Sequence, residues 1–346
     1  MNIIHFINAL ENGGAEKIMY ETILGLNDSF NHRVVTISKR GIYLHKLIEN
    51  GIRVEVLSFR VLSKFLLGSR KDTVIHSYLY RSHALSGLFK FMGYSVIWSI
   101  HGSFPKKANP LKKIVGLLSL FVPDKITFVS KCSLEKHINA GYSAKKSMVI
   151  YNGLDINKFS GNKTCTLDLS SQSFVNICMV SRFHHIKDYP RFFSIASSLI
   201  KLHPKTRFYL IGKGNHADNH ALVNLLHQYN LMQSVTLLGE FSDISQIYPC
   251  FDLLVSTSKS ESFGLTIMEA ILSGVNVSTI NLPVMDELLG EYSTNEGNNK
   301  DGDLALCWLK KAGISPSQSS KEFIMNRYSL DAMLLSFSTL YKSFLR

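Results

Sequence analysis

Cysteine is scarce in this sequence and forms no recognisable motif. The five cysteines are scattered, and none belongs to a C-x-x-C pair; they are Cys132, Cys165, Cys178, Cys250 and Cys307. An odd number of cysteines without paired spacing argues against a disulfide framework and against a zinc site. It also favours a reducing compartment.

Long apolar runs and a secretory signal are missing as well. The longest apolar stretch, Ile114 to Val122, is too short to span a bilayer. The chain begins MNIIHFINALENGGAEK, where no basic segment precedes an apolar one, so this segment is not a secretory signal peptide. Both absences predict a protein that is soluble or bound at the periphery of a membrane.

Acidic residues are few relative to basic ones. The 346 residues include 26 Asp and Glu against 38 Lys and Arg, which gives a formal net charge of +12. Such a charge fits an anionic partner, either a lipid surface, a nucleic acid or a phosphorylated substrate. No nucleic-acid-binding module is recognisable, so we expect no nucleic acid partner. The hydrophobic content of 45% predicts a globular protein, and its length favours two domains.

Short apolar segments typical of buried strands alternate with helical patterns along most of the chain. One series covers residues 2–151, a second covers residues 174–279, and a polar segment rich in Asn, Gly and Ser separates them. This alternation predicts parallel sheets with helices on both faces. We therefore expect an α/β fold with two Rossmann-like domains, residues 1–160 and 161–325, facing each other across a cleft. Residues 326–346 should contain a terminal helix.

The segment 258–270 carries the strongest functional signal. It follows the apolar run Leu253–Val255 and enters a helical pattern, so Glu261 should lie in a loop and Glu269 about two turns into a helix. A helix N-terminus suits a phosphate, and carboxylates suit the hydroxyl groups of sugars. The segment thus indicates a nucleotide-sugar site, with an ordinary surface helix as the alternative.

Two further loops support a phosphate ligand. Arg182 and Lys187 follow the first strand of the second domain, where two cations suit a diphosphate; a solvated basic loop is the alternative. The pair Gly13-Gly14 follows the first strand of the chain, where it allows close approach of a ligand or forms a plain tight turn. The fragment 212–214 lacks the third glycine of a dinucleotide fingerprint, so we expect no nicotinamide cofactor.

Two segments of the first domain combine basic with apolar residues. Such segments suit anionic lipid headgroups, and a core helix with a solvated face is the alternative. The basic residues of the first segment are Arg60, Lys64, Arg70 and Lys71, and those of the second are Lys106, Lys107, Lys112 and Lys113.

Taken together, these residues make the chain similar, nearly end to end, to the family 4 retaining glycosyltransferases of GT-B architecture. Glu261 and Glu269, with Ser-Phe-Gly-Leu after the first, resemble the E-x7-E motif of that family. Arg182 and Lys187 match its R-x4-K clamp, and residues 13–16 match its amino-terminal glycine loop. Residues 152–155 match the N-G-x-D sequence at the domain junction. Three features depart from the family pattern, namely Asp188 in place of a common glycine and the segments 282–287 and 295–302.

The resemblance implies a role for each site residue. Glu269 would hold the ribose diol and Glu261 the hydroxyl groups of the donor sugar, which His101 would reach from the first domain. Arg182 and Lys187 would stabilise the leaving diphosphate, so that neither a metal nor a cofactor is required. The remaining implied donor contacts are Gly13, Gly14, Gly212, Gly214, Phe241, Phe263, Gly264 and Leu265. The terminal helix would cross back to the first domain.

We therefore expect a retaining hexosyltransferase in the cytoplasm, at the inner face of the cytoplasmic membrane. It would move a hexose or N-acetylhexosamine from a UDP- or GDP-linked donor to a glycan, expected to be lipid-linked, during synthesis of a cell-surface polysaccharide such as O-antigen or capsule. The first domain would take the acceptor and the second the donor. The alternatives are a nucleotide-sugar epimerase or hydrolase of the same fold, and a non-catalytic basic protein that binds membrane or nucleic acid.

Overall fold

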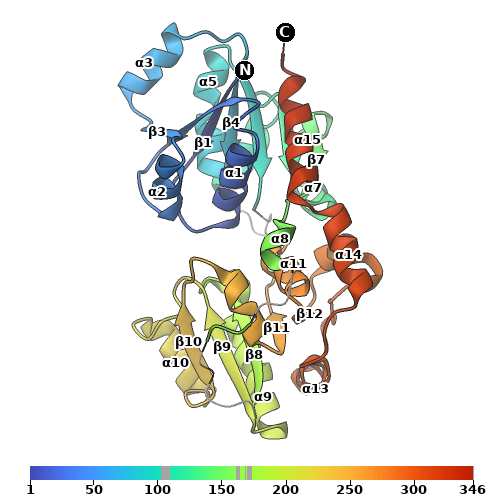
Figure 1. The fold of residues 1–346 in the computed structure, drawn as a ribbon. Helices are drawn as coiled ribbons and strands as arrows, with labels where there is room; N and C mark the ends of the chain where they lie inside the picture. The colour runs from blue at the N-terminus through green and yellow to red at the C-terminus, as the bar shows by residue number, and fades with distance from the viewer. Residues whose placement is uncertain (103–109, 161–163, 168, 170–173, 346) are drawn as a thin grey trace. The chain divides into compact units, whose positions relative to one another are not determined.

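The computed structural model describes residues 1–102, 110–160, 164–167, 169 and 174–345, which form two compact units (Figure 1). The first unit contains Met1–Gly153 and Tyr328–Arg346, and the second contains Leu154–Arg327. The chain thus leaves the first unit at Gly153 rather than at residue 160. The backbone N–H of Gly153 still contacts Met333 of the first unit, with its nitrogen 3.0 Å from Sδ, whereas Phe159 packs beside Tyr248 of the second.

A seven-stranded parallel sheet forms the centre of the first unit, in the order β3-β2-β1-β4-β5-β6-β7. The strands are rich in Ile and Val because helices cover both faces of the sheet. Their bounds are β1 (Asn2–Ile7), β2 (Asn31–Thr36), β3 (Arg53–Val56), β4 (Thr73–Tyr78), β5 (Ser95–Ile100), β6 (Lys125–Phe128) and β7 (Ser147–Val149).

The helices of the first unit form two layers. On one face, α1 (Gly14–Gly25) and α2 (Ile42–Glu49) bury Met19, Ile23 and Leu47. The other face is covered by α3 (Phe59–Leu67), α4 (Tyr80–Leu85), α5 (Gly87–Phe91), α6 (Pro110–Leu118) and α7 (Lys131–Ile138). The 3-10 helix η1 (Ala144–Lys146) leads into β7.

The terminal helix α15 (Leu330–Lys342) returns to the first unit. It packs beside α1, and a side chain on Gly25 of α1 would meet Leu334 of α15 at 2.3 Å. Tyr341 also packs edge-on against Phe30. A terminal helix on the first unit is the arrangement that the resemblance implies.

A five-stranded parallel sheet forms the centre of the second unit, in the order β10-β9-β8-β11-β12. One core cluster of this unit includes Phe192, Phe193, Leu210 and Trp308, all with no exposed area. The strands are β8 (Val175–Val180), β9 (Thr206–Ile211), β10 (Val235–Gly239), β11 (Leu253–Ser256) and β12 (Asn276–Thr279). The α-helices are α8 (Ile156–Phe159), α9 (Tyr189–Leu202), α10 (His220–Gln228), α11 (Leu265–Leu272), α12 (Pro283–Leu289), α13 (Asp301–Lys311) and α14 (Gln318–Arg327).

Short 3-10 helices complete the second unit, and two of them stand where one regular helix would be predicted. They are η2 (His185–Lys187), η3 (Ile244–Gln246), η4 (Tyr248–Cys250) and η5 (Gly290–Tyr292). The apolar pattern of residues 242–250 predicts one continuous helix, but the segment forms η3 and η4 instead. Pro249 lacks a backbone N–H, which prevents a regular helix from continuing through this segment.

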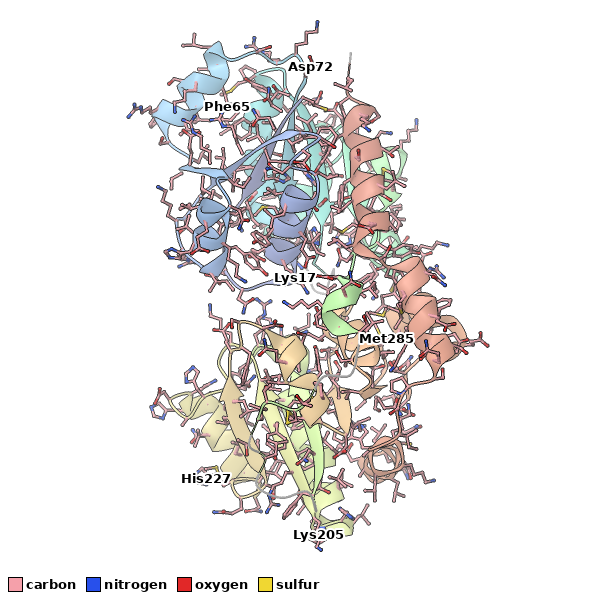
Figure 2. All side chains as sticks on the ribbon, viewed as in Figure 1. Lys17, Phe65, Asp72, Lys205, His227 and Met285 are labelled. Atoms are coloured by element: carbon pink, nitrogen blue, oxygen red, sulfur yellow. A yellow bond between two sulfur atoms is a disulfide. The ribbon has the colours of Figure 1, made fainter. Side chains whose placement is uncertain are left out.

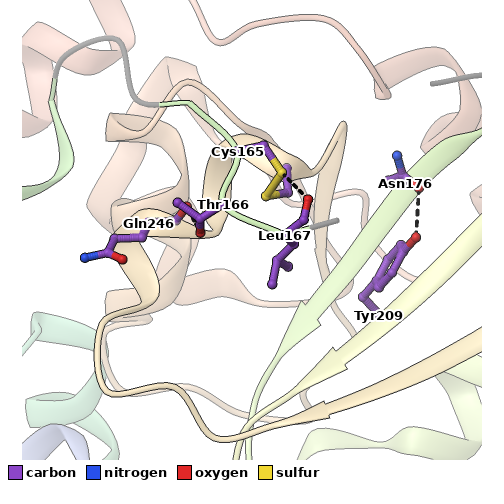
Figure 3. Close-up of a disulfide and its surroundings, with 7 residues drawn as sticks. Cys165, Thr166, Leu167, Asn176, Tyr209 and Gln246 are labelled. Atoms are coloured by element: carbon purple, nitrogen blue, oxygen red, sulfur yellow. Dashed lines mark hydrogen bonds between the residues drawn. A yellow bond between two sulfur atoms is a disulfide. The ribbon is translucent and has the colours of Figure 1, made fainter. Parts of the chain in front are cut away.

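A disulfide joins Cys165 to Cys250, contrary to the expectation of free thiols (Figure 3). The two residues are 85 positions apart in sequence, yet their Cα atoms lie 4.7 Å apart. The neighbouring Thr166 donates its hydroxyl to the carbonyl oxygen of Gln246 at 3.1 Å, which holds the segment before β8 against η3 and η4. The sequence pattern does not reveal such a long-range pair, because nothing local marks either cysteine.

Candidate active site

The predicted donor residues gather at the carboxyl edge of the second sheet. The loop after β8 carries Arg182 and Lys187, and the loop after the neighbouring strand β11 carries Glu261. Two hydrogen bonds connect the loops. The N–H of Lys259 donates to the carbonyl oxygen of Ile186 at 2.8 Å, and the Thr257 hydroxyl donates to the carbonyl oxygen of Lys187 at 2.9 Å. The two loops thus form one continuous wall, at the edge where ligands of parallel sheets bind.

Lys187 and Glu261 form an ion pair on this wall. The Lys187 Nζ lies 2.5 Å from Oε1 of Glu261, and the two side chains are 20% and 18% exposed. The structure therefore brings together two residues that come from separate motifs, 74 positions apart in sequence. The Lys187 charge is thus balanced by a carboxylate that is itself a candidate sugar ligand.

Glu269 lies on α11 and is only 3% exposed. Its Oε2 accepts a hydrogen bond from the Tyr248 hydroxyl at 3.2 Å, and the same hydroxyl lies 3.2 Å from the Thr266 carbonyl oxygen. Burial raises the pKa of Tyr248 well above its usual value, so its hydroxyl keeps the proton that it donates. Tyr248 thus fixes the Glu269 carboxylate, a role that nothing in the sequence around it signals.

The start of α11 depends on Gly264. Its φ of +82° lies in the left-handed region, and a side chain there would meet both Ile267 and Met285 at 3.0 Å. The Phe263 ring is 2% exposed and belongs to the core, so only the backbone of Phe263 can face a ligand. The loop geometry is therefore compatible with the implied use of the amides of Phe263, Gly264 and Leu265.

Asp188 explains one departure from the family pattern. Its φ of +52° is left-handed, which is the conformation that a glycine adopts most easily and that Asp tolerates better than most residues. The Asp188 carboxylate also lies 3.4 Å from Nζ of Lys259. The substitution for glycine thus preserves the turn between Lys187 and α9.

Arg182 is exposed and has no paired carboxylate within the part of the chain that the structure describes. Its loop is held by the next one along the sheet, because the Phe183 N–H donates to the Lys213 carbonyl oxygen at 2.7 Å. Arg182 therefore differs from Lys187 in its charge balance, because the Lys187 charge is balanced by Glu261.

Gly212 and Gly214 both have left-handed φ values, +121° and +85°, in the loop after β9. A side chain on Gly212 would meet the Ser181 carbonyl oxygen at 2.6 Å, so this glycine permits close packing of two backbones. The fully buried Asn215 holds the same loop, since its Nδ2 donates to the Ser181 carbonyl oxygen at 2.8 Å. Phe241 is partly exposed after β10 at the same edge, where the resemblance implies contacts with the base.

Three predicted residues belong to the first unit. Gly13 caps α1 and Gly14 begins it. A side chain on Gly13 would meet Oε2 of Glu16 at 2.4 Å, so in this structure the glycine makes room for that carboxylate. His101 follows β5 and stacks on Tyr78, with ring centroids 5.8 Å apart.

His101 has two ring nitrogens that are buried and lack hydrogen-bond partners within the described part of the chain. Burial lowers its pKa to about 4, so the imidazole is neutral near pH 7. A neutral imidazole can donate through one nitrogen and accept through the other, which suits a sugar hydroxyl.

Metal and membrane features are few in the described ranges. No group of three or more His, Cys, Asp or Glu residues in these ranges is placed to hold a metal ion. No helix within them is both long and apolar enough to cross a membrane. The predicted basic residues Lys106 and Lys107 lie outside the described residues.

Two family models match the chain and together cover most of it. The model for "Glycosyltransferase Family 4" matches residues 12–158, and that for "Glycosyl transferases group 1" matches residues 171–300. The chain belongs to the family 4 glycosyltransferases. This glycosyltransferase is 23% identical over 300 residues to the O-antigen biosynthesis glycosyltransferase WclY of Escherichia coli, with 86% of this chain and 78% of WclY covered.

A second relative supports the assignment, and a solved structure shares the fold. The capsular polysaccharide biosynthesis glycosyltransferase CapH of Staphylococcus aureus is 23% identical over 290 residues, with 78% of each chain covered. The crystal structure of Anabaena Alr3699/HepE in complex with UDP and glucose matches with a TM-score of 0.85 at 20% identity, covering 99% of this chain and 100% of that one. This likeness confirms the GT-B fold of two Rossmann-like domains.

Proposed function

We propose that this glycosyltransferase moves a hexose or N-acetylhexosamine, with retention of anomeric configuration, from a UDP- or GDP-linked donor to a glycan of a cell-surface polysaccharide. The observation that carries the proposal is the group of Lys187, Glu261 and Glu269 at the carboxyl edge of the second sheet. The polysaccharide assignment is supported by the names of WclY and CapH, and the donor class by the UDP and glucose bound to HepE.

Each charged residue has one task in the proposed reaction. Arg182 and Lys187 stabilise the negative charge that develops on the departing diphosphate. Glu269 accepts from the ribose hydroxyls, and Glu261 accepts from hydroxyls of the transferred sugar. A phosphate oxygen of the leaving group takes the proton of the acceptor hydroxyl as the new glycosidic bond forms. We expect no metal requirement, so that activity persists in excess EDTA.

Donor binding provides the first test. Thermal shift against a panel of UDP- and GDP-sugars should raise the melting temperature for one base and sugar, because a ligand specific to the native state stabilises it. Lys187→Ala and Glu269→Ala should each abolish this shift and sugar transfer while the circular dichroism spectrum stays unchanged. Lys201→Ala, at an exposed position of α9, is the matched control. Transfer at the wild-type rate by both site variants would refute the assignment.

The product distinguishes the transferase from its alternatives. Incubation with donor alone should give neither epimer nor free sugar at a comparable rate, and product should require a glycan acceptor. Nuclear magnetic resonance of the new linkage should show the anomeric configuration of the donor. An inverted linkage would contradict retention, and acceptor-independent turnover would favour an epimerase or hydrolase of the same fold.

The expected acceptor is a lipid-linked glycan at the inner face of the cytoplasmic membrane. The excess of basic over acidic residues supports an anionic surface as a partner. A lipid-linked acceptor should give a higher kcat/KM than the same glycan without its lipid, and equal values would remove the lipid from the proposal.

A further inference from the structure

The net positive charge of this chain comes from one part of the first unit. Residues 53–146 contain sixteen Lys and Arg but only four Asp and Glu, a net charge of +12. Since the whole chain has 38 basic and 26 acidic residues, the remainder has 22 of each and no net charge. The segment 53–146 contains the strands β3 to β6 and the helices α3 to α7. These helices form one layer over the first sheet.

Large apolar side chains are exposed where this layer meets the amino ends of the strands. Leu67 is 91% exposed, Phe91 is 95% exposed and Phe121 is 70% exposed. They precede β4, β5 and β6 by only a few residues, and these three strands are neighbours in the sheet. Because neighbouring strands are about 5 Å apart, the three side chains belong to one edge. We call Leu66, Leu67, Phe91, Leu120 and Phe121 the amino-edge rim.

Basic side chains link the turns of the amino-edge rim. Arg70 donates to the carbonyl oxygen of Met92, which connects the turn after α3 to the end of α5. Lys90 pairs with Asp124 at 2.6 Å, and Nζ of Lys146 donates to the Leu120 carbonyl oxygen at 2.8 Å. These contacts join the turns that enter β4 to β7 into a continuous surface. Figure 2 marks its place by Phe65 on α3 and by Asp72 on the turn that enters β4.

Further cations on the same edge are exposed to solvent. Lys71 lies before β4, Lys125 begins β6, and Lys145 lies in η1 before β7. Bulky apolar tips set among Lys and Arg match the headgroup layer of an anionic bilayer, where apolar side chains insert and cations meet lipid phosphates. An acidic protein surface would satisfy the cations but would leave Leu67, Phe91 and Phe121 without a low-polarity environment.

We propose that the amino-edge rim of the first unit docks on a bilayer containing anionic lipid, with Leu67, Phe91 and Phe121 inserted among the headgroups. The rim lies at the opposite edge of the first sheet from Gly13 and His101, which follow the carboxyl ends of β1 and β5. Docking therefore leaves the carboxyl edge of that sheet uncovered. The proposal does not depend on sugar transfer, because lipid binding and nucleotide binding are measured separately.

Vesicle sedimentation with the full chain tests the proposal. The wild type should bind vesicles that contain phosphatidylglycerol. Its affinity for vesicles of phosphatidylcholine alone should be at least about tenfold lower. The triple variant Leu67→Ser, Phe91→Ser, Phe121→Ser should bind anionic vesicles at least about tenfold more weakly than the wild type. The charge variant Lys71→Gln, Lys125→Gln, Lys145→Gln should lose affinity to a similar extent.

Matched controls carry the same chemical changes elsewhere. Ile314→Ser replaces a residue of the second unit that is 58% exposed, and Lys205→Gln replaces an exposed lysine before β9, labelled in Figure 2. Both controls should bind vesicles like the wild type. Any UDP binding should be the same in all variants, which separates a failed rim from a failed donor site. Wild-type vesicle binding by the triple serine variant would overturn the proposal.

Insertion has its own readout. The two tryptophans, Trp98 and Trp308, have no exposed area, so Phe91→Trp adds a single exposed reporter. Brominated lipids should quench its fluorescence, whereas Ile314→Trp should not be quenched. Vesicle binding without quenching of this tryptophan would mean that the protein adsorbs only electrostatically, and it would refute insertion. A stable dimer in vesicle-free buffer that the triple serine variant abolishes would identify the rim as a contact between copies instead.

Discussion

In the proposed donor site of the second unit, the Glu261 carboxylate balances the charge of Lys187. Removing the Glu261 charge while keeping its shape leaves the Lys187 ammonium unmatched. Glu261→Gln should therefore bind UDP or GDP several-fold more tightly than the wild type, because like-charge repulsion falls by one charge at a distance of a few ångströms. Sugar transfer should fall at the same time, since the amide replaces a carboxylate acceptor of sugar hydroxyls. Isothermal titration calorimetry and a transfer assay measure the two effects.

Lys187→Met is the companion variant and should weaken nucleotide binding. If Glu261→Gln weakened UDP binding as much as Lys187→Met does, the carboxylate would be a nucleotide ligand and not a counter-charge for Lys187. The exposed Lys259, which lies 3.4 Å from Asp188, serves as the control in Lys259→Met and should leave binding unchanged.

Asp188 allows a test of backbone conformation at a single residue. Its φ of +52° costs a residue with a Cβ about 1 kcal/mol or more, and Asp offsets part of this through local polar contacts. Asp188→Ala should lower the free energy of unfolding by about 1 kcal/mol, while Asp188→Gly should be close to neutral. Thermal unfolding of both variants measures the difference. A loss of stability in the glycine variant as large as that in the alanine variant would show that the carboxylate, rather than the turn, matters at this position.

Sequence motifs predicted which residues meet at the site, but not the residues that hold them. Lys187 and Glu261 are signalled by spacing and by resemblance, because a charged ligand requires charged residues at strand ends. Tyr248 and Asn215 are buried hydrogen-bonding residues whose partners lie 21 and 34 positions away. Their neighbours in sequence give no sign of these partners, so only the folded chain reveals them.

At the scale of elements, the buried parallel strands were the most predictable part of the fold. Strands such as β11, with all four residues buried, contain short apolar runs that the sequence reveals directly. The helices between residue 281 and the predicted terminal helix, α12, α13 and α14, were missed. In α14 only Ser320 and Ile324 are buried, and in α12 the apolar residues are grouped in pairs over seven positions, so neither gives a clear helical period.

The disulfide between Cys165 and Cys250 ties the segment before β8 to η4, the helix that contains Tyr248. Cross-linking residues 85 positions apart should stabilise the second unit by about 4.5 kcal/mol through the entropy of the unfolded chain. Dithiothreitol should therefore lower the unfolding temperature of that unit, followed through the buried Trp308 in a Trp98→Phe background. Cys165→Ser should show the same low value with or without reductant.

The location of the enzyme bears on this disulfide. In a reducing compartment both cysteines are expected as thiols, and alkylation of protein taken directly from cells would label them. An unfolding temperature that does not respond to reductant in the wild type would mean that the disulfide contributes nothing to the stability of the second unit.

At the scale of the whole molecule, the two units differ in how they carry histidine. The first unit buries His5, His32, His76, His83 and His137 in and beside its sheet. Several form direct contacts with one another or with Tyr341 of α15; His5 Nε2 lies 2.9 Å from His32 Nδ1, and His76 Nδ1 lies 2.7 Å from the Tyr341 hydroxyl. Two facing imidazoles share one hydrogen only if at least one ring is neutral, so this network requires unprotonated histidines.

This network predicts that acid unfolds the first unit before the second. Burial lowers the pKa of His32 and of His137 to about 4, and it lowers those of His5, His76 and His83 well below their usual range. In the unfolded chain each titrates near 6.5, so the unfolded state binds more protons between pH 6.5 and 4. Their contribution to stability is therefore complete above about pH 7 and is lost as the pH falls, by up to about 1.4 kcal/mol per histidine and pH unit.

Each unit contains one buried tryptophan, which allows the two transitions to be followed separately. Trp308→Phe leaves Trp98 to report on the first unit, and Trp98→Phe leaves Trp308 to report on the second. Between pH 7.5 and 5 the thermal midpoint reported by Trp98 should fall steeply. The midpoint reported by Trp308 should fall much less, because His184 is the only histidine in the described part of the second unit whose pKa is lowered, first by partial burial and then by the nearby Arg182 charge. Equal shifts at both tryptophans would show that the buried histidines of the first unit do not control its response to acid.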